Sequence, residues 1–386
     1  MRIVIAPDSY KESLSAVEVA QAIAAGVRDV LPDADVVCVP MADGGEGSLD
    51  AVLAATGGQR RVRTACDANG RQVQASWGWL GRGRAFIEMA EAAGLERIAA
   101  DQRDVMAASS YGVGQLIIQA VDDGARHIVI GLGGSATNDA GAGLLEALGV
   151  RFLDEDGRPL PRGGAALRRL DRMDASGVDK RLQDVTFELA VDVDNPLCGP
   201  QGASAIFGPQ KGATPEQVRQ LDDALGRFAD YCAQAFGKDE RNLPGMGAAG
   251  GLGFAVKTFF DATFRPGVEL VAELAGLPQA LKGAGLVFTG EGRMDAQTLL
   301  GKTPAGVARY ARQAGGIPVI ALAGSLGDAY QALYGVGITA AFSLTPGPVD
   351  LAYACENASR LLRERASDCM RVWVAAHQAA SLHSSP

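Results

Sequence analysis

Short apolar runs with the character of strands alternate with helix-period stretches at both ends of the chain. Near the start, "RIVIA" is followed by Ser15 and Glu18 at the spacing of a capping box, and then by an apolar helical face that reaches Val30. The next apolar run is "DVVCVP", and the far end continues with "AGLVFTGEG", "IPVIALAGS" and "ITAAFSLTP". This alternation is typical of a parallel sheet covered by helices. It predicts a flavodoxin- or Rossmann-like α/β domain built from both chain ends, residues 1–59 and 266–386.

The middle of the chain follows a different pattern. From Arg60 to Met89, polar and apolar residues alternate around "DANG" and "GRG", which predicts antiparallel hairpins. A long helix is expected to begin at Thr214, because an apolar stripe follows it and ends just before Gly237. We therefore expect a second, inserted domain with a mixed sheet over residues 60–265, so that the fold class is two α/β domains.

Charge and composition narrow the range of partners. The net charge of −9 over 386 residues argues against nucleic acid or an acidic membrane as the main partner. The six scattered cysteines suit reduced thiols, and the three isolated histidines supply neither a zinc site nor a histidine-based triad. No uncharged apolar run of membrane-spanning length is present in the sequence. We expect a cytoplasmic protein with small-molecule ligands, and the sequence leaves a homodimer open.

The segment "IVIGLGGSATNDAGAG" places a glycine-rich loop directly after a β-branched run. Glycines in this position let backbone amides approach an anion, and residues 137–139 are helix-capping types that predict the start of a helix. We assign nucleotide phosphates to this loop, with the candidate residues Gly133, Gly134, Ser135, Thr137 and Asn138.

Two other interpretations of this loop stay open. Gly131, Gly133 and Ala136 fit a dinucleotide-binding fingerprint, with Asp154 as the acid that follows it. Alternatively, the glycines only allow a tight turn between strand and helix.

Further polar loops follow other predicted strands, and acids outnumber bases in them. The candidates are Asp8, Ser9, Lys11, Asp43, Glu46, Asp192, Asp194, Asn195, Lys211, Glu291, Arg293, Asp295 and Lys302. This ratio suits a site for Mg²⁺ and a nucleotide, which needs carboxylates for the metal and a few cations for phosphate oxygens. The "GKT" at residues 301–303 is not a P-loop, because Ala296 stands where that motif requires glycine.

Six ordered segments resemble the bacterial glycerate kinase type 1 family. They are "IAPDSYKESLSA", "MADGGEGS", "GLGGSATNDAGAG", "VDVDNPLCGPQGASAIFGPQKGA", "GAAGGLG" and "TGEGRMDAQTLLGKTP". The resemblance runs from residue 1 to about residue 375. It implies phosphorylation of D-glycerate by ATP with Mg²⁺, on a two-domain α/β fold with the active site between the domains. Family precedent favours 2-phosphoglycerate over 3-phosphoglycerate as the product.

The residues receive the following hypothetical roles. Asp192 follows an apolar strand, is expected to be buried there, and is our choice for the base that accepts a hydroxyl proton. Lys11 and Arg293 are the catalytic cations that would neutralise the transferring phosphoryl group or the glycerate carboxylate. Substrate binding is assigned to Asp8, Ser9, Lys211, Asn195 and Glu291, and metal binding to Asp43 and Asp295. Asp8 also competes for the metal, and any of these aspartates could exchange roles with Asp192.

Two other function classes are weighed against the kinase. An NAD-dependent dehydrogenase of a small hydroxy acid would explain only the glycine fingerprint and Asp154. A non-catalytic acid-binding regulator would explain the cations but not the surplus of carboxylates.

Overall fold

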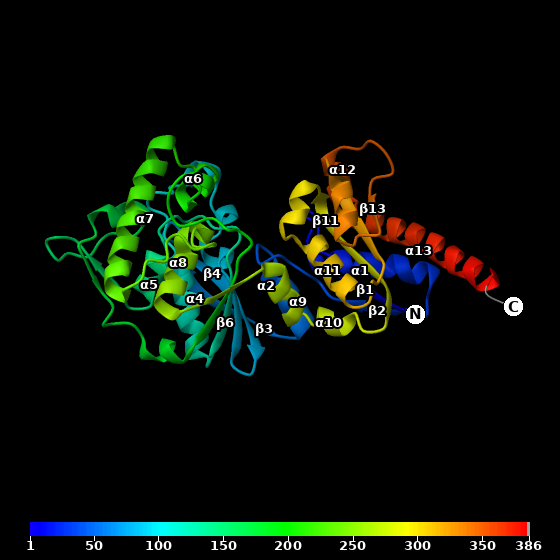
Figure 1. Ribbon diagram of the computed structural model, residues 1–386, viewed down its shortest axis with the longest axis horizontal. Coiled ribbons are helices and arrows are strands. Elements are labelled where there is room, and N and C mark those ends of the chain that lie inside the picture. The colour runs from blue at the N-terminus through cyan, green and yellow to red at the C-terminus, as the bar shows by residue number, and fades with distance from the viewer. Residues whose placement is uncertain (384–386) are drawn as a thin grey trace. The chain divides into compact units, whose positions relative to one another are not determined.

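The computed structural model describes residues 1–383, which form two compact units (Figure 1). Unit 1 consists of Met1–Asp43, Asp50–Gly57 and the chain from Val268 onward. Unit 2 consists of Gly44–Leu49 and Gly58–Gly267. Six residues that lie between two parts of unit 1 in the sequence therefore belong to unit 2.

Unit 1 is built on a five-stranded sheet in which all neighbouring strands are parallel. The sheet order is β13-β12-β11-β1-β2. The strands are β1 (Arg2–Ile5), β2 (Asp35–Cys38), β11 (Ala284–Met294), β12 (Val319–Leu326) and β13 (Ala340–Ser343). Numbered within this unit, the order is 2-1-3-4-5, which is that of the flavodoxin-like doubly wound fold. The predicted parallel sheet from both chain ends is confirmed.

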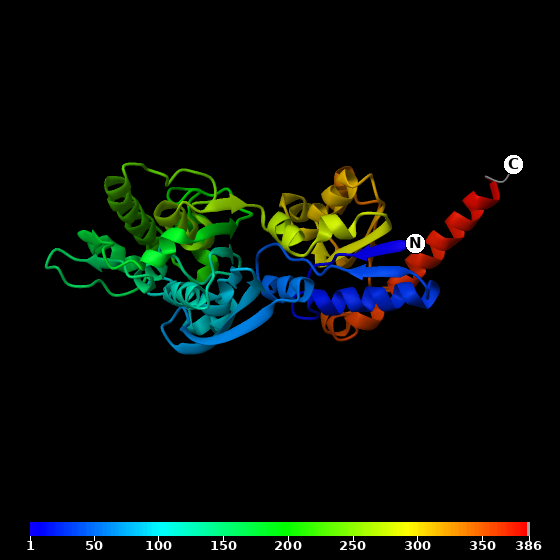
Figure 2. The same cartoon turned by 90° about the horizontal axis from the view of Figure 1, so that it is seen from below.

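Helices cover this sheet. They are α1 (Ala16–Val30), α2 (Ser48–Thr56), α9 (Gly267–Leu274), α10 (Leu277–Ala280), α11 (Thr303–Gln313), α12 (Leu351–Glu356) and α13 (Ala358–His383), with 3₁₀ turns at Ala296–Leu300 and Tyr330–Val336. The predicted capping box of Ser15 and Glu18 is present at the start of α1. Helices α1 and α13 lie side by side, where the Arg363 guanidinium pairs with Asp29 (Figure 2). Their apolar faces pack with Ile3 and Phe288 of the sheet.

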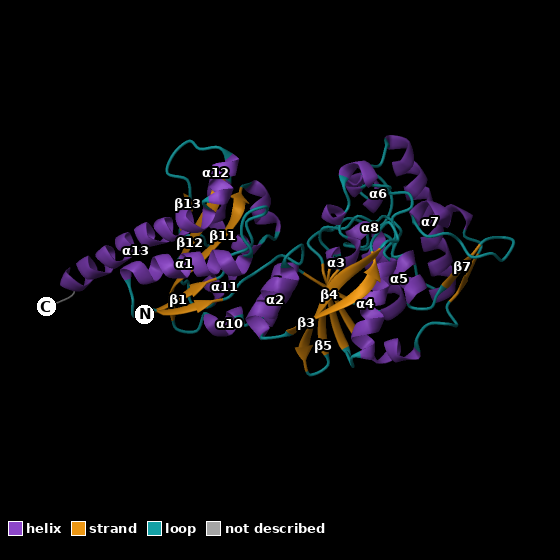
Figure 3. Cartoon of the chain, turned by 180° about the vertical axis from the view of Figure 1, so that it is seen from behind, coloured by secondary structure: helices purple, strands orange, loops and turns teal. Residues whose placement is uncertain are grey.

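Unit 2 contains a six-stranded mixed sheet in the order β10-β9-β6-β5-β4-β3 (Figure 3). The strands are β3 (Gln59–Cys66), β4 (Gln72–Gly81), β5 (Arg84–Glu88), β6 (His127–Gly131), β9 (Thr186–Ala190) and β10 (Thr263–Arg265). The first three form the predicted antiparallel hairpins, and β5, β6, β9 and β10 are parallel. A separate antiparallel pair joins β7 (Arg151–Leu153) and β8 (Arg172–Asp174).

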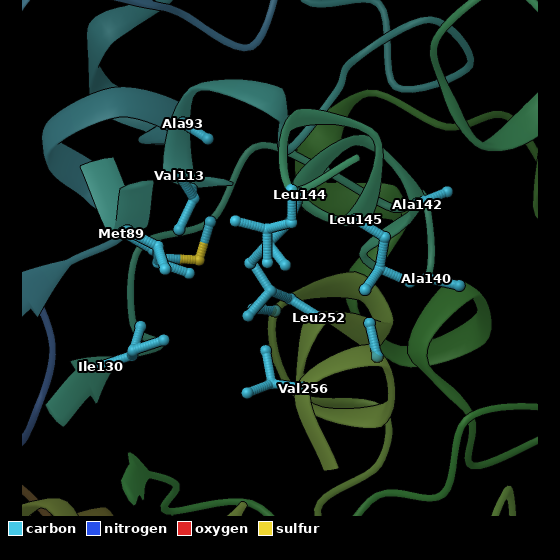
Figure 4. Close-up of a cluster of buried hydrophobic side chains, with 14 of the residues drawn as sticks. Met89, Ala93, Val113, Ile130, Ala140, Ala142, Leu144, Leu145, Leu252 and Val256 are labelled. Atoms are coloured by element: carbon cyan, nitrogen blue, oxygen red, sulfur yellow. The ribbon is translucent and has the colours of Figure 1, made fainter. Parts of the chain in front are cut away.

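The helices of unit 2 are α3 (Ala90–Ala93), α4 (Tyr111–Asp122), α5 (Ala142–Ala147), α6 (Ala203–Phe207), α7 (Pro215–Phe236) and α8 (Ala248–Phe260). Short 3₁₀ turns occupy Leu95–Arg97, Ala100–Gln102, Gly164–Arg169, Lys180–Asp184 and Pro209–Lys211. Helix α7 is confirmed as predicted, with a capping box at Thr214 and a left-handed Gly237 after its last turn. The core beneath the glycine loop joins β6, α4, α5 and α8 (Figure 4). Its members include Ile130, Val113, Leu144 and Leu252.

Within residues 1–383, none of the helices combines the length and apolar character that crossing a membrane requires.

Candidate functional site

Three acidic side chains of unit 1 interact at one edge of its sheet, and we call them the acid cluster: Asp8, Asp43 and Glu291. Asp8 follows β1 and Glu291 lies in β11, and the Asp8 amide donates to the Gly290 carbonyl at 2.8 Å. These adjacent strands are where the chain order of the sheet reverses. Ligands of open α/β sheets bind at this switch point, beyond the carboxyl ends of the strands.

Two hydrogen-bond donors stabilise the charged form of the Asp8 carboxylate. Its Oδ1 accepts from the Ser9 amide at 2.7 Å, and its Oδ2 accepts from the Thr303 hydroxyl at 2.5 Å. Burial, together with the nearby charges of Asp43 and Glu291, raises the pKa of Asp8 to about 7. The hydrogen bond from Thr303 acts in the opposite direction.

Glu291 is held by the segment that contains the false P-loop motif. The Thr298 hydroxyl donates to its Oε1 at 2.6 Å, and the Lys302 Nζ lies 3.6 Å from its Oε2. Burial raises the pKa of Glu291, while Thr298 and Lys302 lower it. Residues 298–303 therefore orient two members of the acid cluster, because Thr303 also binds Asp8.

The chemistry of this cluster fits a hard divalent cation. Its donors are carboxylate oxygens, and the half-buried Asp8 gains an opposite charge if a cation binds. Nowhere in the described part of the chain do three or more acidic, histidine or cysteine side chains form a complete ligand set. Such a partial set is common for Mg²⁺, which keeps waters and binds one or two carboxylates together with substrate phosphates.

The other predicted residues of unit 1 have different surroundings. The Asp295 carboxylate caps the 3₁₀ turn at 296–300, accepting from the Gln297 amide at 2.9 Å, and it also accepts from Arg293 Nε at 3.2 Å. The Arg293 side chain is 69% exposed, and Lys11 is exposed as well. Ser9 contacts Asp8 directly. Of the two predicted metal ligands, Asp43 and Asp295, only Asp43 has a charge that raises the pKa of Asp8.

A second cluster lies in unit 2, around a buried lysine. The Lys211 Nζ donates to the Ser135 hydroxyl at 2.8 Å and to the Thr137 carbonyl at 2.7 Å. Burial lowers the pKa of Lys211 to about 7, partly offset by the charge of Asp139. Lys211 thus binds the glycine loop itself through two neutral oxygens.

This second cluster also has polar atoms that fit a further ligand. Thr137 Oγ1 and Asn138 Oδ1 are buried and lack a hydrogen-bond partner among residues 1–383. The Asn138 amide group donates to the Ser204 hydroxyl at 2.8 Å. The tip of the loop is exposed at Gly134, which has a φ of 71°. The Thr137 hydroxyl and the amides of the glycine tip can donate to phosphate oxygens, whereas Asn138 Oδ1 can only accept a hydrogen bond.

The helix expected to begin at residues 137–139 starts later, and this corrects the prediction. Helix α5 begins at Ala142 after a left-handed Gly141. Asp139 is fully buried, and its carboxylate accepts from the Ser110 hydroxyl and from the amides of Ser110, Gly141 and Gly143. The backbone turns through a left-handed Ala140 and Gly141 before α5 begins, so the argument from helix N-terminal amides does not hold for residues 137–139.

Two loop glycines have a packing reason that the sequence did not reveal. A Cβ on Gly131 would lie 2.5 Å from the Gly44 carbonyl oxygen, and one on Gly133 would lie 2.4 Å from the Gly45 Cα. The backbone of 44–45 therefore passes directly over the loop. The close approach of this backbone is a different reason for glycine at these two positions than the tight strand-to-helix turn considered from the sequence.

Asp192 is exposed, which corrects the expected burial. It lies two residues beyond β9, and its Oδ1 accepts from the Gly267 amide at 2.9 Å. Asn195 closes its own loop, because its side chain donates to the Gln201 carbonyl at 2.8 Å. Both side chains fix loops at the carboxyl end of β9.

Asp154 does not occupy the position that a dinucleotide site requires. It follows β7, which pairs only with β8 in a sheet separate from β6, and it accepts from the amides of Asp156 and Arg158 in a tight turn. The acid of a dinucleotide fold instead follows a strand of the same sheet. This placement argues against the dehydrogenase interpretation.

Sequence reasoning missed Glu88, Thr298 and Thr303 as members or supports of these clusters. Glu88 is an acid at the end of the apolar run "RAFIE", and burial raises its pKa to about 7. An acid as the last residue of an apolar, strand-like run can be recognised in the sequence. The two threonines are visible only once the fold brings them to Glu291 and Asp8.

Comparison with known proteins gives a consistent result. The sequence profile of the "Glycerate kinase family" matches residues 3–374. The chain is 48% identical to a glycerate kinase of Halalkalibacterium halodurans, covering 94% of this chain and 96% of that protein. It is 47% identical to the glycerate 2-kinase of Escherichia coli, covering 95% and 97%. A crystal structure described as a glycerate kinase 2 of Salmonella typhimurium superposes with a TM-score of 0.88 at 47% identity, covering 98% and 99% of the two chains.

Proposed function

This chain belongs to the glycerate kinase family, and from that premise we propose that it transfers a phosphoryl group from ATP to the 2-hydroxyl of D-glycerate with the help of Mg²⁺. Membership of the family makes it a kinase. The name glycerate 2-kinase of the Escherichia coli relative supports the choice of hydroxyl.

The observation that carries the proposal is the acid cluster at the switch point of the flavodoxin-like sheet. The half-buried Asp8 lies beside Asp43 and Glu291, whose charges help to raise its pKa, and a divalent cation is the natural complement of such a group. Asp8 and Asp43 are the residues proposed to hold Mg²⁺, with Asp43 retained from the sequence assignment and Asp8 replacing Asp295. When bound, Mg²⁺ supplies charge neutralisation for phosphate oxygens.

Phosphates of ATP are assigned to the glycine loop, with Gly133, Gly134, Ser135, Thr137 and Asn138 as the proposed contacts. Lys211 lies beneath this loop, and a bound anion would favour its ammonium form. Its two hydrogen bonds to the loop hold Ser135 and Thr137 in place for that contact.

The remaining roles concern glycerate and the proton of its hydroxyl. Asp192 is the proposed base, because its carboxylate is accessible while one oxygen is oriented by the Gly267 amide. Arg293 and Lys11 are exposed cations proposed to neutralise the glycerate carboxylate and the transferring phosphoryl group. Ser9, Glu291 and Asn195 remain proposed substrate contacts. Transfer is proposed to be in line.

The experiment uses purified protein with ATP, Mg²⁺ and D-glycerate. We expect stoichiometric release of ADP and phosphoglycerate, with loss of both when the metal is chelated. Phosphorus NMR of the product separates the 2-phosphate from the 3-phosphate. ADP without phosphoglycerate would contradict the kinase assignment, and a 3-phosphate product would contradict the choice of hydroxyl.

The cytoplasmic location and the lack of nucleic-acid partners stay predictions from the sequence, and a homodimer stays open. Light scattering coupled to size exclusion measures the oligomeric state directly.

A further inference from the structure

The segment Gly44–Leu49, which we call the crossover segment, leaves unit 1 and packs into unit 2. A Cβ on Gly44 would lie 2.7 Å from the Ala190 Cβ, and the Gly133 amide donates to the Gly44 carbonyl at 3.3 Å. The segment therefore lies against the carboxyl end of β9 and against the glycine loop. Its chain position places it directly after Asp43 of the acid cluster.

One buried carboxylate holds this segment. Glu88 ends β5 and is 4% exposed. Its Oε1 accepts from the Gly47 amide at 3.2 Å, and its Oε2 accepts from the Leu49 amide at 3.0 Å. Both oxygens of a single side chain thus serve backbone donors of the crossover segment. A carboxylate that accepts two amides restrains the segment at two points.

We propose that Glu88 is a positioning residue for phosphoryl transfer: by clamping the Gly47 and Leu49 amides, it fixes the crossover segment, and through that segment it holds both Asp43 and the glycine loop in their working places. The inference rests on the proposed function for the roles of Asp43 and the loop. Glu88 itself touches neither nucleotide nor glycerate in this scheme.

Glu88 can act on Asp43 and on the glycine loop because the chain between the clamped amides and these two groups is short. Only three residues separate Asp43 from Gly47, and the Gly44 carbonyl accepts from the Gly133 amide. If the clamp is released, the backbone of residues 44–46 gains freedom, and both neighbours lose a fixed position. Residues that orient metal ligands in this indirect way change metal affinity or activity by about 10- to 100-fold when replaced.

Unit 2 offers a matched control in Asp67. This carboxylate is 6% exposed and accepts from two backbone amides, those of Asn69 at 2.9 Å and Arg71 at 2.8 Å, in the turn between β3 and β4. Asp67 therefore resembles Glu88 in burial and in bonding but restrains a different segment. A general loss of stability would affect both variants alike.

The test compares Glu88→Gln and Glu88→Ala with Asp67→Asn in the full chain. Hydrogen exchange of residues 44–49 reports the clamp. Mn²⁺ binding in the presence of a non-hydrolysable ATP analogue, followed by electron paramagnetic resonance, reports the metal site without turnover. We expect faster exchange of the crossover segment, a loss of Mn²⁺ affinity or of kcat of about 10- to 100-fold for Glu88→Ala, and a smaller loss for Glu88→Gln, which keeps one acceptor. Asp67→Asn should leave all three measurements at wild-type values.

A second variant acts on the clamp from its other side. Gly47 has a φ of 85° and open space where a Cβ would lie, so Gly47→Ala strains only the backbone and leaves Glu88 intact. Gly47→Ala should reproduce the effect of Glu88→Gln on exchange, Mn²⁺ affinity and kcat. If the Glu88 variants do not fold, this variant alone tests the role of the clamp. Wild-type Mn²⁺ affinity and kcat despite faster exchange in Glu88→Gln or Gly47→Ala would overturn the inference, as would unchanged exchange in Glu88→Ala. Failure of the wild type to make phosphoglycerate would instead refute the proposed function, while exchange and Mn²⁺ binding still test the clamp.

Discussion

The Lys211 ammonium donates to the Ser135 hydroxyl at 2.8 Å, inside unit 2 and almost out of contact with solvent. A lysine buried with neutral oxygens is costly unless a negative charge approaches it. Asp139 is the charge that raises its pKa, but the effect of burial is larger. A negatively charged ligand at the exposed tip of the glycine loop would therefore favour the ammonium form of Lys211.

Replacing Lys211 by Met keeps an unbranched chain but removes the cation and both hydrogen bonds to the loop. We expect the KM for ATP to rise on the order of 10- to 100-fold, because a hydrogen bond from a charged donor contributes about 1.5–3 kcal/mol. ATP titrations at saturating D-glycerate measure this. Lys180→Met, an exposed lysine of the same unit, is the control and should bind ATP normally. An unchanged KM would remove Lys211 from the nucleotide site.

Stability should depend on pH through the same side chain. The pKa of Lys211 is about 7 in the folded chain and 10.5 ordinarily. Between these values the unfolded chain keeps a proton that the folded chain releases, so the free energy of unfolding rises with pH, by at most about 1.4 kcal/mol per pH unit. Urea unfolding from pH 7 to pH 9 should show a steeper rise for the wild type than for Lys211→Met. Parallel curves would contradict the lowered pKa.

Thr303 is fully buried, and its hydroxyl is the side-chain donor to Asp8 Oδ2. Thr303→Val conserves shape and leaves that oxygen without its donor, which costs about 1–3 kcal/mol of stability. Because Asp8 is a proposed metal ligand, we also expect the Mg²⁺ concentration for half-maximal velocity to rise by about 10-fold or more. Thr258→Val, a buried threonine whose hydroxyl contacts Glu240 in unit 2, should change stability without changing the Mg²⁺ requirement. A normal Mg²⁺ requirement in Thr303→Val would argue against Asp8 as a ligand.

The periodic parts of the fold were predictable because their signals are local. The capping boxes at Ser15 and Thr214, the hairpins around Asp67–Gly70 and Gly81–Gly83, and the alternation at both chain ends each depend on neighbouring residues. The passage of Gly44–Leu49 into the other unit leaves no such signal, since it depends on contacts with Glu88 and Gly133 that are far away in sequence.

The sequence predicted which types of residue form the candidate site, but not the role of each individual residue. Asp8 and Glu291 come together because β1 and β11 are adjacent, as loops at one sheet edge predict. Asp295 was assigned to metal, although its spacing to Thr298 already has the form of a helix cap. Asp192 was expected to be buried because its strand is apolar, but the strand ends at Ala190 and the chain turns outward after it.

Because the proposed reaction needs groups of both units, substrates should change the scattering of the whole chain. We expect a non-hydrolysable ATP analogue with D-glycerate and Mg²⁺ to reduce the radius of gyration and to slow hydrogen exchange in residues 131–139. Small-angle scattering and exchange mass spectrometry measure the two effects. The analogue alone should protect the loop, since the phosphates are assigned there. An unchanged radius together with unchanged exchange would place the nucleotide elsewhere.

The variant Asp192→Asn distinguishes two roles of Asp192, that of a general base and that of an anchor for its loop. Asparagine keeps a carbonyl oxygen that can accept from the Gly267 amide, and the exposed position tolerates the loss of charge, so the fold should persist. Removal of a general base lowers kcat by about 10²- to 10⁴-fold while the KM for ATP changes little. Asp194→Asn, also exposed and two residues further along, is the matched control and should retain wild-type kcat. Excess Mg²⁺ or Mn²⁺ should not rescue Asp192→Asn, because rescue by metal would identify a ligand. If kcat instead stays within about 10-fold of the wild type, a loss smaller than removal of a base causes, Asp192 only anchors its loop and the base must be sought in the acid cluster.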